Sequence, residues 1–342
     1  MRKILLMAAG IATMASPLRA QSCPAPDAQG QVVFPGGAIA MRTALAVNPD
    51  GAAASYTPGD HGYTYVANGV NLRVPAVLSC SAAGNGGRCR REWLRAESLG
   101  FGPGSPEFCV FAMEVEPIAA GAGLVSCGRG RSIAGGGKGR PKLGAAFPAA
   151  AGGTVRPYLS TTSLRERVGG QTRYVDSAAV PALVVPTSRP DLVGAVAWVR
   201  FGGRHSFAIV GDTGPRFGEG SVALHQRLRS GSIGPAQPVG PIPRALRCTS
   251  AETALRPPFQ SRPDVDGDRC RAGRPPAGAT DIRAYAGIDE RAVDSVILAG
   301  VRLPMEGSTV IGEISLSALE QRAAAAGFDG ARLAAMAACA AH

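Results

Sequence analysis

Short apolar runs separated by glycine and proline dominate this chain, and they favour strands and turns over long helices. In the first half the strongest strand pattern is 108–115. A second run, 71–80, predicts a strand interrupted at Pro75, and the alternation in 31–34 and 62–66 predicts two short strands. The expected fold is therefore mostly β.

The second half carries a stronger strand pattern. One buried strand is predicted over 180–185 and another over 192–201. The glycine pair at 202–203 then makes a hairpin turn into the apolar run 206–210, which fits a buried central strand. The two later strands are predicted over 282–288 and 294–303.

Helices are predicted where apolar positions recur at helical spacing behind a serine. Ser221 can cap a helix whose apolar residues continue to Leu228. A second helix is predicted over 316–326, capped by Ser315 or Ser317.

A proline- and glycine-rich stretch, 233–281, is expected to be an insertion within one domain. Within it the segment DVDGDRC places oxygen ligands at alternate positions from Asp264 to Asp268, which is the chemistry of a calcium loop. No glutamate follows at the distance that such a loop needs, so an ordinary Asp-rich turn is the competing interpretation.

Residues 1–20 have the layout of a secretory signal peptide, with two basic residues, an apolar run and Ala20 before the expected cut. The mature protein is therefore expected to be secreted or periplasmic, and no later stretch is apolar for long enough to span a membrane. We divide the mature chain into 21–150, with strands and basic glycine-rich loops, and 151–342, with the candidate chemistry.

All eight cysteines fall in the mature chain, and an even number in an exported protein predicts disulfides. Proximity favours Cys80 with Cys89, Cys109 with Cys127 and Cys248 with Cys270, which leaves Cys23 for Cys339. No cluster of cysteine and histidine at metal spacing occurs, and neither His205 nor His225 has a second ligand. We therefore expect no metal site and no cofactor.

The formal net charge is +11, and it falls to +8 when Arg2, Lys3 and Arg19 leave with the signal peptide. A basic protein suits an anionic or neutral polymer better than a polycation. The basic loop 128–142 contains GGGKG, but the lysine is followed by Gly139 rather than Ser or Thr. A solvated loop is therefore favoured over a phosphate loop, and no nucleic-acid partner is expected.

Two carboxylates lie seven residues apart after the predicted central strand. Asp212 is expected in a tight DTGP turn, and Glu219 lies between Gly218 and Gly220, whose backbone is flexible. Hydrolysis of a glycosidic bond needs such a pair, with one protonated carboxyl and one carboxylate that activates water. The competing interpretation is that Asp212 hydrogen-bonds its turn and Glu219 complements a helix dipole.

Three motifs add a resemblance. They are YLSTTSL at 158–164, RYVDSAAVPALVVP at 173–186, and GDTGP followed by GEGSVAL within 211–224. In this order they resemble the core of glycoside hydrolase family 75, the chitosanase family, over 158–228. An acidic DxDCDG-like segment that members of the family often carry upstream is not found.

The resemblance implies an inverting, endo-acting hydrolase of chitosan, a β-1,4-linked amino-sugar polymer, with Asp212 and Glu219 as its essential acidic pair. Which of the two is the acid stays open. The strand pattern and the analogy with other glycan-cleaving barrels predict a six-stranded double-psi-like barrel with helices outside.

Four further residues are expected at the substrate. They are Thr213, Asp176, Tyr174 and Tyr158. Asp176 is either a third carboxylate of the cleft or a cap of its turn, and the tyrosines, with Trp198 and Phe217, are candidates for stacking on sugar rings.

Two other functions remain open. Cleavage of peptidoglycan would suit the basic charge, and a protein that kept the fold without catalysis would be a glycan-binding protein of the envelope.

Overall fold

The computed structural model describes residues 23–240, 259–261, 282–284 and 287–341. The predicted signal peptide, the Asp264 to Asp268 segment and the predicted Cys248–Cys270 bond lie outside the described residues.

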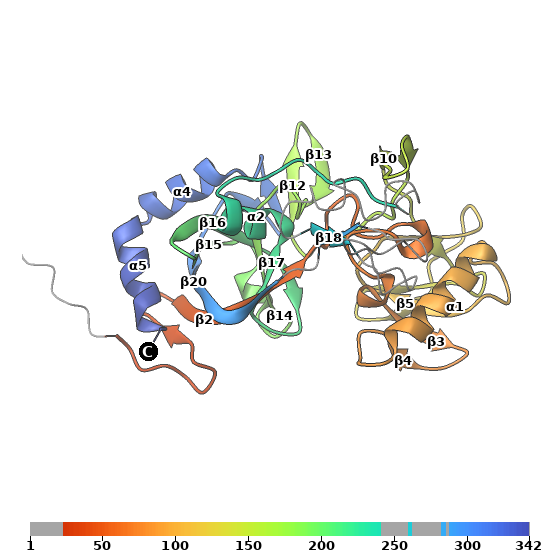
Figure 1. Cartoon of the computed structure of the whole chain (residues 1–342), viewed down its shortest axis with the longest axis horizontal. Helices are drawn as coiled ribbons and strands as arrows, with labels where there is room; N and C mark the ends of the chain where they lie inside the picture. The colour runs from red at the N-terminus through yellow and green to blue at the C-terminus, as the bar shows by residue number, and fades with distance from the viewer. Residues whose placement is uncertain (1–22, 241–258, 262–281, 285–286, 342) are drawn as a thin grey trace, which may run out of the picture.

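Six strands form a closed barrel of mixed parallel and antiparallel pairs (Figure 1). In order around the barrel they are β2 (Ala38–Asn48), β17 (Glu219–Ser221), β14 (Ala182–Pro186), β16 (Arg204–Gly214), β15 (Ala195–Phe201) and β20 (Ile288–Arg302). Pairing of β20 with β2 closes the ring, and β1 (Val32–Val33) extends it at β2. The predicted mostly β fold with a six-stranded barrel is confirmed.

Along each barrel strand, successive side chains pack alternately into the core on one face of the barrel wall and the core on the other. In β15, Val196 and Trp198 pack into one buried cluster, whereas Ala197 and Val199 pack into another. Successive side chains of a strand point to opposite faces, so a strand buried on both sides reads as a continuous apolar run.

Three helices pack against the barrel: α2 (Val222–Ser230), α4 (Leu316–Ala325) and α5 (Gly330–Cys339). Both serine caps were correctly predicted, since Ser221 accepts a hydrogen bond from Leu224 N at 3.1 Å and Ser315 accepts one from Ala318 N at 3.2 Å. Helix α5 was not predicted. Figure 1 shows α4 and α5 on the side of the barrel away from α1 (Gly86–Ser98).

A five-stranded sheet forms a second unit with α1. Its strands, in order, are β4 (Leu78–Ser79), β3 (Val70–Val74), β5 (Glu107–Val110), β8 (Arg131–Ala134) and β7 (Ser126–Gly128). Trp93 of α1 is fully buried and packs edge-to-face on Phe101, Phe108 and Tyr158. Helix α1 was not predicted, because it begins with two glycines, which disfavour helix, and because its mean hydropathy is low.

Several sequence-predicted strands differ from the structure. The prediction of a strand over 62–66 is wrong, because Tyr63 and Thr64 donate backbone hydrogen bonds to the nearby residues 54–55, and the 3-10 helix η2 (Val66–Asn68) follows. The predicted run 71–80 divides into β3 and β4, and 108–115 divides into β5 and β6 (Val115–Glu116).

The remaining elements are short. A four-stranded sheet contains β13 (Gln171–Tyr174), β12 (Arg165–Val168), β22 (Thr309–Ile311) and β21 (Met305–Glu306). Strand pairs are β6 with β9 (Arg140–Pro141), β10 (Phe147–Pro148) with β11 (Thr154–Val155), and β18 (Phe259–Ser261) with β19 (Ile282–Ala284). Two more 3-10 helices are η1 (Pro58–Asp60) and η3 (Pro190–Leu192).

Three disulfides connect the described residues, and all three were predicted: Cys23–Cys339, Cys80–Cys89 and Cys109–Cys127. The first joins the start of the described chain to the end of α5. Among the helices of the described residues, none has both the length and the apolar character needed to cross a membrane.

Candidate active site

A groove of about 1130 Å³ lies where the barrel meets the five-stranded sheet. The barrel contributes the ends of β2 and β16, Thr187 directly after β14, and the start of β17, and the sheet contributes residues of β3, β4, β5 and β8. Asp212 and Glu219 both line it.

The register of the barrel explains how these two carboxylates meet in one groove. Val184 of β14 pairs with Asp212 of β16 on one side and with Glu219 of β17 on the other. Two strand spacings therefore separate the two backbones, about 10 Å. The Glu219 carboxylate reaches back toward β16, since its oxygens lie 3.6 and 3.8 Å from where a Cβ on Gly214 would be.

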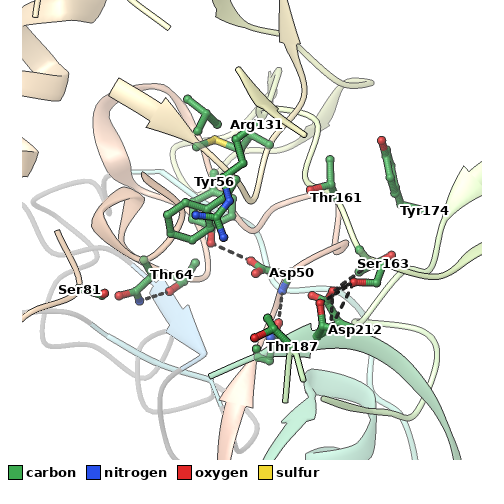
Figure 2. A pocket seen from close by; sticks show the side chains of 18 of the residues that line it. Asp50, Tyr56, Thr64, Ser81, Arg131, Thr161, Ser163, Tyr174, Thr187 and Asp212 are labelled. Atoms are coloured by element: carbon green, nitrogen blue, oxygen red, sulfur yellow. Dashed lines mark hydrogen bonds between the residues drawn. The ribbon is translucent and has the colours of Figure 1, made fainter. Parts of the chain in front are cut away.

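Asp212 lies within β16, which continues to Gly214, so the prediction of a tight turn at Asp212 is wrong. Pairing with β14 keeps this segment extended. Its Oδ1 accepts three hydrogen bonds, from Ser163 N at 2.9 Å, Ser163 Oγ at 2.6 Å and Thr213 N at 2.8 Å. Figure 2 shows the cluster of Ser163 and Asp212.

Glu219 has weaker partners. Asn48 Nδ2 lies 3.5 Å from its Oε2, which is long for a hydrogen bond. Gly218 has φ +98°, and a Cβ there would lie 2.9 Å from Ala44 O, so β17 can approach β2 only with glycine at this position. Gly220 is packed rather than flexible, because a Cβ on it would meet the side chain of Leu224 at 3.0 Å.

A third carboxylate, Asp50, lines the same groove and was missed in the sequence. It follows β2, a strand that was not predicted, in the turn Asn48–Pro49–Asp50–Gly51. Tyr56 donates its hydroxyl to Asp50 Oδ1 at 2.7 Å, and Asp50 N donates to Asn48 Oδ1 at 2.8 Å. The sequence pattern that pointed to Asp212, a carboxylate directly after an apolar run, would also have predicted Asp50 as a site residue.

The backbone around Asp50 is held on both sides. Ser55 and Ser177 both donate hydrogen bonds to Pro49 O, and Gly51 N donates to Ser160 Oγ at 3.0 Å. Gly51 has φ +87°, and a Cβ there would lie 2.1 Å from Val175 O. The position of Asp50 is therefore set by the fold.

Burial is the first cause that raises the pKa of all three carboxyl groups. For Asp50 the negative charges of Asp212 and Glu219 raise it further, and its pKa lies well above the usual value, although the Tyr56 hydrogen bond acts in the opposite direction. The hydrogen bonds from Ser163 and Thr213 partly offset the rise at Asp212. The three groups interact through their charges, so they titrate as one unit.

The four other expected site residues divide into two pairs. Thr213 and Tyr174 line the groove: Thr213 Oγ1 is 3.1 Å from Ser163 Oγ, and Tyr174 donates its hydroxyl to Glu114 at 2.8 Å. Asp176 lies outside the groove lining and accepts a hydrogen bond from Ala178 N at 2.8 Å, which fits its interpretation as a turn cap.

Tyr158 also lies outside the groove lining. Its ring is buried against Trp93, and its hydroxyl donates to Glu97 at 2.7 Å. Trp198 is buried in the barrel wall, and Phe217 packs partly buried against a core cluster. None of these three aromatic side chains is placed to stack on a sugar in the groove.

The loop with GGGKG is held by an ion pair, because Lys138 Nζ lies 2.8 Å from both carboxylate oxygens of Glu107. His225 is buried, and its Nε2 lies 3.1 Å from Ala46 O. In the part of the chain that the structure describes, no group of three or more His, Cys, Asp or Glu side chains is arranged to hold a metal ion.

The sequence matches no protein-family model, and it has no significant match among curated proteins.

Proposed function

We propose that the protein is a glycoside hydrolase that cleaves a β-1,4-linked amino-sugar polymer in this groove. The observation that carries the proposal is the register of β14, which sets Asp212 and Glu219 on either side of Val184 in one groove. Two carboxyl groups that line one groove suit acid and base catalysis across a glycosidic bond.

The hydrogen bonds favour different roles for the two groups. Three donors act on one oxygen of Asp212, and such donors stabilise a carboxylate, so we assign Asp212 as the base that activates water. Glu219 has no comparable donors and its pKa is raised first by burial, so we assign it as the acid that protonates the leaving oxygen.

Asp50 adds a third carboxyl group to the same groove. Ionisation of all three carboxyl groups would place three negative charges in one partly buried groove. A proton is therefore retained within the group to higher pH than an isolated carboxyl would hold it, and Asp50, whose pKa lies well above its usual value, is its main holder. The pKa of Glu219, the assigned acid, is raised by burial and by the charge of Asp212.

The polymer itself is proposed on the resemblance, which points to chitosan and to inversion of the anomeric centre. Secretion or export to the periplasm belongs to the same proposal, and the three disulfides support it because such bonds persist in oxidising compartments.

The test is release of reducing ends by the mature protein from chitosan and, in parallel, from purified peptidoglycan. Asp212→Asn and Glu219→Gln should each lower the rate by about 10²- to 10⁴-fold, because each removes one partner of the proton transfer.

Glu313→Gln is the matched control. Glu313 is exposed, precedes α4 in a GE-then-helix pattern like that of Glu219, and lies outside the groove lining, so its substitution should leave the rate unchanged. Near-full activity of either groove variant would refute the assigned pair. Binding of a polymer without its cleavage would instead favour the glycan-binding alternative.

A further inference from the structure

Acidic and basic side chains from different parts of the fold line the groove. The carboxylates Asp50, Asp212 and Glu219 come from the barrel end, whereas Arg129 and Arg131 come from the hairpin of β7 and β8. A glycan lying in the groove would contact both groups of charges.

Arg131 is a half-buried cation with a fixed support. Its guanidinium lies over the ring of Phe111, 4.9 Å from the centroid. No described carboxylate forms an ion pair with Arg131. A guanidinium stacked in this way keeps the N–H groups of its edge available for a carboxylate ligand.

The hairpin that carries Arg131 is rigidly attached. Val110 of β5 pairs with Ser132 of β8, and the Cys109–Cys127 disulfide joins β5 to β7. Arg129 lies exposed at the turn of the hairpin with φ +52°. The fold therefore holds two cations on one platform at the groove.

The two other charged residues of the groove lining, Glu114 and Arg165, already have partners. Glu114 forms an ion pair with Lys142 at 2.9 Å and accepts the hydroxyl of Tyr174. Although burial acts to raise the pKa of Glu114, the hydrogen bonds from Lys142 and Tyr174 lower it overall, so this side chain stays ionised and paired. Arg165 is stacked on Tyr174 at 4.6 Å and donates to its hydroxyl.

The arginines of the hairpin are not the counter-charges of the catalytic end. The main influences on the pKa values of Asp50 and Asp212 are burial, hydrogen bonds and neighbouring carboxylates, and no arginine is among them. In the view of Figure 2, Arg131 lies on the Tyr56 side of Asp50, and Asp212 lies on the other side.

We propose that Arg131, with Arg129, forms a subsite for a carboxylate substituent of the polymer, so that the substrate is an anionic amino-sugar glycan of the peptidoglycan type. This inference rests on the proposed hydrolysis of an amino-sugar polymer, and it replaces chitosan, the polymer to which the resemblance points, with an anionic one. A polycation such as chitosan would place its ammonium groups against these arginines, which is unfavourable.

The experiment measures binding separately from catalysis. In the Glu219→Gln background, affinity is compared for purified peptidoglycan and for the same material with its carboxylates amidated by a carbodiimide and ethanolamine. Arg131→Gln should weaken binding of untreated peptidoglycan by about tenfold or more, the usual effect of losing a charge-assisted hydrogen bond, and should not change binding of the amidated material. Arg131→Lys should give an intermediate loss, because it keeps the charge without the bidentate geometry.

Arg332→Gln is the matched control. Arg332 is also an arginine stacked on a phenylalanine, at 4.4 Å from the ring of Phe328, but it is exposed and lies on α5 outside the groove lining. The Arg332→Gln substitution removes the same charge as Arg131→Gln and should leave the binding of peptidoglycan unchanged.

Two results separate the subsite from the hydrolysis. If no polymer is cleaved but binding depends on the carboxylates and on Arg131, the proposed hydrolysis fails and the subsite stands. If peptidoglycan is cleaved but amidation and Arg131→Gln change neither affinity nor KM, the subsite is overturned. An equal loss of affinity in Arg332→Gln would also overturn it, since a general charge effect would then explain the result.

Discussion

At the scale of single residues, the three groove carboxylates differ in what surrounds them. Asp212 has three donors on one oxygen, Asp50 has the hydroxyl of Tyr56, and Glu219 has one distant amide. Burial raises the pKa of each, so a barrel with these carboxylates is less stable at neutral pH than one without them.

Asp50→Asn should therefore stabilise the protein at neutral and alkaline pH. The pKa of Asp50 is raised in the fold by burial and by Asp212, so its contribution to the free energy of unfolding is fully present below the ordinary value of 3.8 and is lost as the pH rises through the raised value. Asparagine keeps an acceptor for Tyr56 without the charge. Thermal melting across the pH range should show a higher Tm for the variant above about pH 7 and no gain near pH 4.

Asp191→Asn serves as the control for this experiment. Asp191 is exposed, and its pKa is lowered by the hydrogen bond from Arg189, so removing its charge should give no gain at neutral pH. A similar gain in both variants would mean that net charge, rather than burial of Asp50, controls the pH dependence.

At the scale of elements, β2 and the turn after it contribute five consecutive residues, 46–50, to the groove's barrel end. Asn48 is the last residue of β2, and the turn from Pro49 to Gly51 is tied to the residues around it by three serines. The turn has no freedom to move Asp50, because Gly51 approaches the backbone of Val175 too closely for any side chain.

Gly51→Ala should be strongly destabilising. The new Cβ would lie 2.1 Å from Val175 O in a backbone conformation with φ +87°, so the turn must shift. We expect a loss of about 2 kcal/mol or more in the free energy of unfolding, measured by denaturant titration, together with a loss of activity.

The matched variant is Gly152→Ala. Gly152 has a similar φ of +90°, but nothing lies within 4 Å of its added Cβ. Gly152→Ala therefore measures the backbone strain alone and should lower the free energy of unfolding by about 1 kcal/mol. Equal losses in the two variants would contradict the close approach at Gly51.

At the scale of the whole molecule, the groove belongs to neither the barrel nor the sheet alone. The barrel end contributes Asp50, Asp212 and Glu219, and the sheet with its β7–β8 turn contributes Arg129, Arg131 and uncharged polar side chains such as Asn71 and Ser79. On the far side of the barrel, the Cys23–Cys339 disulfide attaches α5 to the beginning of the described chain.

Replacing Cys23 and Cys339 by serine should lower stability without affecting the groove. The bond closes a loop with a sequence separation of 316, and the chain-entropy model gives a cost of about 5 to 6 kcal/mol for a loop of this length. Denaturant unfolding under non-reducing conditions measures this, and kcat/KM at a temperature where the variant stays folded should be unchanged.

The Cys109–Cys127 pair provides the comparison, because its sequence separation is 18 and the same model gives about 3 kcal/mol. A larger loss of unfolding free energy from removing Cys109–Cys127 than from removing Cys23–Cys339 would contradict the chain-entropy explanation. A loss of activity in the Cys23 and Cys339 variant would show that this bond also affects the structure of the groove.

The local elements were predictable where one short-range signal decides them. Ser221 and Ser315 cap their helices, the glycine pair at 202–203 turns the chain between β15 and β16, and cysteines near in sequence form their bonds. Prediction was wrong where a distant segment decides. The segment at Asp212 has turn residues, yet pairing with β14 keeps it extended.

The sequence by itself determined the mostly β class, the two catalytic candidates and the pairing of cysteines that are near one another in the chain, because apolar alternation, carboxylate placement and cysteine spacing are local properties of the chain. Only the tertiary structure decided that β14 lies between Asp212 and Glu219, that Asp50 joins them, and that Arg131 lines the same groove. Those relations depend on strand register and on the contact between barrel and sheet, which join residues far apart in the chain.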